Sequence, residues 1–143
     1  MSRWLFGAFV AAVLLVAGCA PPPPTAPRAV EVHSEYGRAC ARLEDGTVRC
    51  WGGGYPGDGT TGPVTPLPVQ VAGLDDVVDL GVGAGHTCAV RADGTLWCWG
   101  AGSSGQLGTP VDASTVPVQV PDIDDAVAVA PGYFHTCALD AEG

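Results

Sequence analysis

His86-Thr-Cys-Ala-Val-Arg-Ala-Asp-Gly-Thr-Leu-Trp-Cys-Trp99 is the stretch that decides the fold. Asp93-Gly94 is a strong signal for a hairpin turn. A three-residue loop of residues 92–94, with Gly94 at positive φ, places Cys88 opposite Cys98 on the two strands. Side chains then alternate between the face of the two sulfurs (Val90, Leu96) and the other face (Ala89, Arg91, Thr95, Trp97). The stretch therefore predicts a β-hairpin with its cysteines in register.

The same unit recurs along the chain at a spacing of 48 to 49 residues. The matching positions are Cys40, Cys88 and Cys137; the turns at 45–46, 93–94 and 142–143; Cys-Trp-Gly at 50–52 and 98–100; Pro-Val-Gln-Val at 68–71 and 117–120; and Asp-Asp at 75–76 and 124–125. We therefore expect repeats over residues 30–143, two full (30–76 and 77–125) and the opening of a third (126–143). In the first unit Arg42 stands where the second has Val90, so we expect a poorer apolar face there.

Composition supports short strands and turns throughout the repeats. The chain holds 21 glycines and 13 prolines and has no helical periodicity, which predicts an all-β fold. It has no lysine, six arginines and fifteen acidic residues, for a net charge of −9. Such a surface repels phosphate backbones, so we expect no nucleic-acid binding.

The N-terminus has the anatomy of an export signal. Arg3 precedes an uncharged run over residues 4–16, and Val16-Ala17-Gly18-Cys19 resembles a bacterial lipobox. We interpret residues 1–18 as a lipoprotein signal peptide, Cys19 as the lipidated mature N-terminus, and residues 19–29 as a proline-rich tether. An uncleaved anchor and ordinary secretion are the alternatives. The predicted location is the cell envelope or the cell surface, with the protein held to the membrane by its lipid.

The remaining five cysteines fit the hairpins. Export and the repeat favour a disulfide between Cys40 and Cys50 and another between Cys88 and Cys98, with Cys137 unpaired. Four reduced, buried thiols are the alternative.

These motifs resemble the RCC1-like (regulator of chromosome condensation) repeat family. The second unit carries the resemblance most fully, with Gly85-His86-Thr87-Cys88-Ala89-Val90, then residues 93–100, then Gly105-Gln106-Leu107-Gly108. The first unit departs from the pattern, because Arg38 replaces the histidine and Gly57-Asp58-Gly59-Thr60 replaces the Gly-Gln-Leu-Gly loop. The resemblance implies a partial β-propeller of RCC1-like blades. An open stack leaves strand edges unpaired and an apolar face uncovered, so we expect a truncated product or, as the alternative, assembly with other copies.

Several motifs resemble nucleotide- or metal-binding sites, but a structural role in turns or strands is favoured for each of them. Gly100 to Gly105 satisfies G-x-G-x-x-G, but Pro110 soon follows where a nucleotide site needs a helix, so we expect a turn. His86-x-Cys88 and His135-x-Cys137 contain zinc-ligand types, yet hydrogen bonding between strands is the favoured role of the histidines. The acidic groups at Asp75, Asp76 and Asp79 and at Asp122, Asp124 and Asp125 could bind calcium but are typical of turns. The sequence thus predicts no cofactor and no metal.

No catalytic group is evident in the sequence. Ser103, Ser104 and Ser114 lack the flanking residues of a nucleophile, and Trp51, Trp97, Trp99, Tyr55 and Tyr133 form either a binding surface or core. We expect a membrane-anchored, non-catalytic protein-interaction module that is a fragment of a larger propeller and binds a protein partner. The alternatives are a regulator of an enzyme, as an inhibitor or as the guanine-nucleotide exchange factor that the family name suggests, and a hydrolase.

The lipobox generates a direct prediction. Mass spectrometry of membrane-extracted protein should find a mature N-terminus at Cys19 that carries lipid, and Cys19→Ser should accumulate as precursor or in soluble form. An unmodified N-terminus at any other residue would contradict the assignment.

Overall fold

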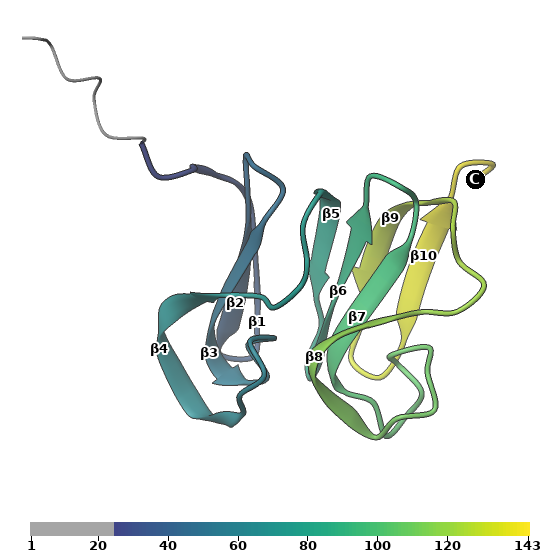
Figure 1. Ribbon diagram of the computed structural model, residues 1–143. Helices are drawn as coiled ribbons and strands as arrows, with labels where there is room; N and C mark the ends of the chain where they lie inside the picture. The colour runs from purple at the N-terminus through teal and green to yellow at the C-terminus, as the bar shows by residue number, and fades with distance from the viewer. Residues whose placement is uncertain (1–24) are drawn as a thin grey trace, which may run out of the picture.

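The computed structural model describes residues 25–143, which form ten β-strands in three antiparallel sheets (Figure 1). The first sheet holds β1 (Ala29–Glu35), β2 (Arg38–Leu43), β3 (Val48–Gly54) and β4 (Gly62–Gln70). The second holds β5 (Val77–Val82), β6 (His86–Arg91), β7 (Leu96–Ala101) and β8 (Ala113–Gln119), and the third holds β9 (Ala126–Pro131) and β10 (Thr136–Asp140). The all-β prediction is confirmed. Cys19 and the predicted signal peptide lie outside the described residues, as does most of the tether.

Each sheet is a meander in which neighbours in sequence are neighbours in space. Each four-stranded sheet is drawn from a single repeat of the sequence. No helix within residues 25–143 is long and apolar enough to cross a membrane.

The predicted hairpin register is confirmed. Cys88 lies opposite Cys98 and Val90 opposite Leu96, while Gly94 has a φ of 82°. In the first sheet Cys40 lies opposite Cys50 in the same way. Arg42 is accommodated there by Glu31 on β1, whose carboxylate accepts a hydrogen bond of 2.7 Å from the guanidinium Nε.

Apolar side chains fill the two spaces between the sheets. Between the first and second sheets lie buried residues of both, namely Cys40, Val48, Cys50, Val71, Leu74, Val77, Leu80, Ala89 and Trp99. Between the second and third lie Cys88, Val90, Leu96, Cys98, Leu107, Val120, Ala126 and Val129. The cysteine face of each sheet thus packs against the opposite face of the next one. This regular stacking buries both faces of the second sheet.

The turns of one sheet also contact the next sheet through the backbone. The amide of Ala126 donates to the carbonyl of Gly94 at 3.0 Å, and the amide of Val77 donates to that of Gly46 at 3.0 Å. A Cβ on Gly94 would collide with the carbonyl oxygen of Asp124. Glycine is therefore needed at this turn both for its positive φ and for the close approach of the next sheet.

Strands β4 and β8 lie at edges of their sheets, and neither contains a buried residue. Three prolines interrupt β4, at residues 63, 66 and 68. Proline lacks an amide donor, so an edge strand is where a sheet tolerates it.

Trp99 and Trp51 occupy the same repeat position in different surroundings, which gives a matched test of the stacking. Trp99 is fully buried between two sheets, whereas Trp51 is only partly buried on the outer face of the first. Trp99→Ala should lower the free energy of unfolding by about 3–5 kcal/mol, because the cavity lies inside a packed core. Trp51→Ala should cost less than half as much. Denaturant unfolding followed by circular dichroism makes the comparison, and equal losses would contradict this packing scheme.

Candidate functional site

The five cysteines in the described range occupy two kinds of surroundings. Cys40 and Cys50 lie at disulfide distance, with Cα atoms 4.1 Å apart, and Cys88 and Cys98 repeat this separation. All four are buried, so these sulfurs serve the core and not a surface site. Cys137, the corresponding residue of β10, is a free and exposed thiol.

The residues weighed as metal or nucleotide ligands have structural partners. The imidazole Nε2 of His86 lies 2.8 Å from the hydroxyl of Thr136, and Cys88 is held against Cys98. Asp79 accepts a hydrogen bond of 2.7 Å from the amide of Val129 in the next sheet. Gly105, in the G-x-G-x-x-G motif, has a φ of 80° in a turn whose amide donates to the carbonyl of Gly102. Within residues 25–143, no three metal-ligating side chains gather.

A buried polar side chain at one repeat position links each sheet to the next. Arg38, on β2, donates to the carbonyls of Gly83 and His86 at 2.8 and 2.9 Å. His86, at the equivalent position on β6, bonds Thr136 on β10. The Thr136 hydroxyl itself donates to the carbonyl of Gln106 at 2.8 Å, so His86 Nε2 is the donor to Thr136. The histidine thus bonds between strands, and the two strands belong to different sheets.

Burial shifts the pKa of both linking side chains. It lowers the pKa of Arg38 to about 10, which leaves the guanidinium protonated at neutral pH. Burial, followed by the charges of Arg38 and His135, lowers the pKa of His86 to about 4. His86 is therefore neutral at pH 7, with its proton on Nε2 and no hydrogen-bond partner among the described residues at the buried Nδ1. It carries no exposed surface, so it is an element of the fold.

An exposed aromatic cluster lies where the β1–β2 and β9–β10 turns meet. It consists of Tyr36, Tyr133 and Phe134, whose residues are 69%, 52% and 60% exposed. The rings of Tyr36 and Tyr133 meet edge to face with centroids 5.5 Å apart, and those of Tyr133 and Phe134 are 4.3 Å apart. Residues 36, 84 and 133 share one repeat position, and the small Ala84 between them lets the two tyrosines touch.

A groove of about 280 Å³ runs beside this aromatic cluster. The residues that line it include Tyr36 and Tyr133, the small residues Gly83, Ala84 and Gly132, and the acidic residue Glu35. Aromatic faces next to a carboxylate attract a cationic group through cation–π and Coulomb interactions. The arrangement is therefore suited to an arginine or lysine side chain.

Tyr36 also has a strained backbone, with a φ of 45°. A bulky residue rarely adopts this conformation, and its cost is of order 1–3 kcal/mol. Gly37, directly after it, also has a positive φ. The turn therefore holds an exposed tyrosine where a smaller residue would be more stable, which points to a use for the ring.

The sequence had singled out Tyr133 but not Tyr36, Phe134 or Glu35. Trp99 and Tyr55, also considered for a surface, pack in or against the first core. The repeat spacing relates positions 36 and 133, and this was the signal in the sequence that could have drawn attention to Tyr36. Contact between two residues almost a hundred positions apart could be seen only once the sheets were stacked.

Two family models of the regulator of chromosome condensation (RCC1) repeat match the chain, over residues 93–139 and 77–106. This chain is an RCC1-like repeat protein. The resemblance inferred from the hairpin motifs is thereby confirmed. No curated protein matches the chain.

Solved structures extend the likeness to the three sheets together. Human WBSCR16 is 23% identical with a TM-score of 0.73, over 82% of this chain and 32% of its own. Prp20p of Saccharomyces cerevisiae is 18% identical with a TM-score of 0.70, over 84% of this chain and 33% of its own. The ectodomain of the Arabidopsis thaliana receptor kinase ACR4 is 18% identical with a TM-score of 0.51, over 84% and 36%. These likenesses show the fold, and the RCC1-like chain spans about a third of each structure. The three sheets are blades of a partial β-propeller.

The depressed pKa of His86 makes the stability of the blade stack depend on pH. The unfolded chain has an ordinary histidine pKa near 6.5, so between pH 6.5 and 4 it binds more protons than the folded chain does. Stability should therefore fall as the pH drops through this window, by up to about 3 kcal/mol. Urea unfolding at pH 7.5 and pH 4.5 measures the loss. His86→Asn should remove most of the difference, whereas His33→Gln, a change on the exposed edge strand β1, should preserve it.

Proposed function

We propose that this RCC1-like chain is a non-catalytic, protein-binding module whose aromatic cluster receives a basic side chain of the partner. The observation that carries the proposal is the edge-to-face contact of Tyr36 with Tyr133. It assembles one exposed surface from the first and third blades. Exposed, clustered aromatics are typical of the central residues of protein interfaces.

The charge of the protein supports a basic partner. With a net charge of −9 and no lysine, the chain attracts positively charged surfaces and gains association rate from them. Glu35, one of the acidic residues, is among those that line the groove beside the cluster.

Relatives of the same fold support a protein partner in general. The yeast Prp20p structure is described together with its binding to Gsp1p and histones, and another structure of that protein shows it bound to Kap60. The identities are 18% and 19%, so the class of partner, and not its identity, is what we carry over to this chain.

The proposed module is anchored to the membrane and has no catalytic role. The lipobox at residues 16–19 supports a lipid anchor, with the Pro-rich tether setting the module away from the membrane. Burial of His86 and its bond to Thr136 support a non-catalytic role, because they keep this histidine from any substrate.

A peptide array tests the binding surface. Arrayed octapeptides with one to three arginines or lysines, matched to versions with glutamate in their place, are probed with the labelled full chain. We expect the basic peptides to bind and the acidic ones to fail, with affinity falling as salt rises. Tyr36→Gly should weaken the best basic peptide by about tenfold or more, or ~1.4 kcal/mol.

Tyr36→Gly is chosen because glycine relieves the positive φ, so the turn can keep its backbone conformation when the ring is removed. Leu67→Ala is the matched control, since Leu67 is 72% exposed on β4, outside the aromatic cluster. Equal binding by Tyr36→Gly and the unmodified chain, or equal binding of acidic peptides, would overturn the proposal.

A further inference from the structure

The first strand of each blade carries the same backbone irregularity. A β-bulge interrupts the pairing of β1 with β2, of β5 with β6 and of β9 with β10. The extra residue of the bulge is a valine in all three blades, and these valines recur at the repeat spacing as Val30, Val78 and Val127. A bulge leaves its extra residue unpaired and re-aims the side chain out of the regular alternation of the strand. The fold thus displays one valine per blade by the same device.

The three valines, which we call the valine row, are exposed on neighbouring strands. Val30, Val78 and Val127 are 53%, 47% and 48% exposed. Strand β5 contacts β1 on one side and β9 on the other, so the row runs across all three blades. Val78 belongs to the second blade, which packs against a neighbour on both of its faces. Its exposure therefore does not arise at an end of the stack.

A groove of about 430 Å³ joins two members of the valine row. Val78 and Val127 both line it, together with Arg91, Asp93 and Asp125. The Arg91 guanidinium is already engaged, because it bonds the Asp75 carboxylate at 2.6 Å and lies 3.8 Å from that of Asp93. Asp125 forms no ion pair with any residue of the described chain. The groove therefore offers apolar surface beside a carboxylate that lacks a cation.

The end of the molecule around the valine row is strongly acidic. In Figure 1 it is the upper end of the sheets, where the β2–β3 and β6–β7 turns lie against the entry of the next blade. Eight of the fifteen acidic residues of the chain lie in these turns and entries, all exposed, at positions 44–45, 75–76, 93, 122 and 124–125. Arg28 and Arg91 lie there too, and each already bonds a carboxylate. Such a surface attracts cations and repels anions.

We propose that the valine row is a docking surface for a segment of a protein partner that has an apolar centre flanked by arginines or lysines. The apolar centre packs on the valines, and the flanking cations meet the carboxylates of the surrounding turns. Burial of apolar surface supplies affinity, and charge complementarity supplies specificity. A second copy of this chain, with its net charge of −9, and an anionic membrane are disfavoured occupants, because both carry negative charge.

This surface is separate from the aromatic cluster of the proposed function. Val30 and Tyr36 stand at opposite ends of β1, six residues apart in the sequence, which is about 20 Å along a strand. The aromatic cluster needs only a cation, whereas the valine row needs apolar side chains as well. Either surface can therefore fail without the other.

The synthetic peptide Arg-Arg-Leu-Val-Leu-Arg-Arg is the probe. Fluorescence anisotropy of the labelled peptide with the full chain should give saturable binding. Replacing its three apolar residues by serine, or its arginines by glutamate, should weaken binding by about tenfold or more, because each change removes one half of the complementarity. Equal binding of the serine peptide would show that charge alone is recognised, and either this result or no binding up to millimolar protein would overturn the proposal.

Variants of the chain locate the peptide. Val78→Ser should weaken binding by about fivefold or more, since it removes apolar surface at the centre of the row. Leu67→Ser is the matched control, because Leu67 is 72% exposed on β4, away from the valine row. Asp125→Asn should weaken binding by a few-fold at low salt, whereas Asp112→Asn, at another exposed aspartate, should not. Full binding by Val78→Ser, or a loss equal to that in Leu67→Ser, would contradict the assignment.

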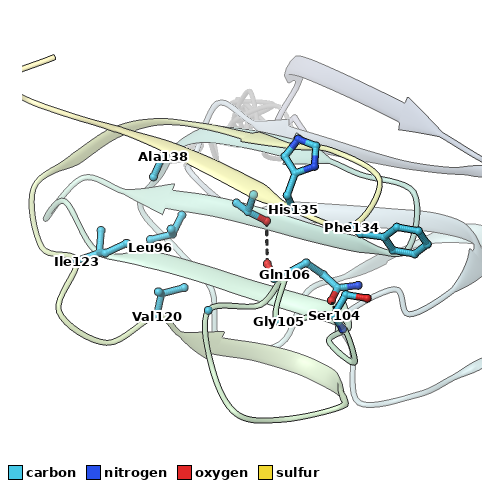
Figure 2. A pocket seen from close by; sticks show the side chains of 11 residues that line it. Leu96, Ser104, Gly105, Gln106, Val120, Ile123, Phe134, His135 and Ala138 are labelled. Atoms are coloured by element: carbon cyan, nitrogen blue, oxygen red, sulfur yellow. Dashed lines mark hydrogen bonds between the residues drawn. The ribbon is translucent and has the colours of Figure 1, made fainter.

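An apolar recess of about 470 Å³ beside β10 is the competing site for such a peptide (Figure 2). Figure 2 shows Leu96, Val120 and Ile123 together on one side of it, with Ala138 on β10 above them. Its lining holds no acidic residue of the described chain, so it lacks the carboxylates that the arginines of the peptide need. Ala138→Phe narrows this recess and should leave binding unchanged. Loss of binding in Ala138→Phe, with full binding in Val78→Ser, would place the peptide in the recess and overturn the proposal.

Discussion

Packing of the cysteine face of one blade against the opposite face of the next is the contact on which the rest of this structure depends. Trp99 is its clearest instance, because it leaves the second blade on the side facing the first and is wholly buried against Val48 and Val71. A single two- to four-stranded sheet cannot bury its apolar face alone, so each blade is stable only through its neighbours. The second blade has neighbours on both sides and holds the most completely buried strands.

Polar groups at the blade interfaces act with this packing. Arg38 and His86 stand at the same repeat position and both bond the next blade, one through backbone carbonyls and one through the Thr136 hydroxyl. Buried donors of this kind cost free energy unless they are satisfied, so they favour one alignment of the blades over slipped ones. The two residues differ in charge, and only the histidine makes the stack sensitive to mildly acidic pH.

The same stacking creates the proposed binding surface. Tyr36 and Tyr133 belong to different blades, and they meet because the intervening blade has Ala84 at their repeat position. The aromatic cluster is therefore a property of three blades and of no single repeat. Its neighbours, Glu35 and the strained turn at residues 36–37, give that surface its charge and its exposed ring.

The sequence alone determined the hairpin, its register and the repeat, because alternation along a strand and the Asp-Gly turn are local rules that Cys88 and Cys98 obey without reference to distant residues. It could not show that Arg42 would be matched by Glu31, that His86 would bond across blades, or that Tyr36 would touch Tyr133. Those contacts were decided by tertiary structure, because they join residues of different strands or blades whose distance depends on how the sheets stack, and no local pattern encodes that distance.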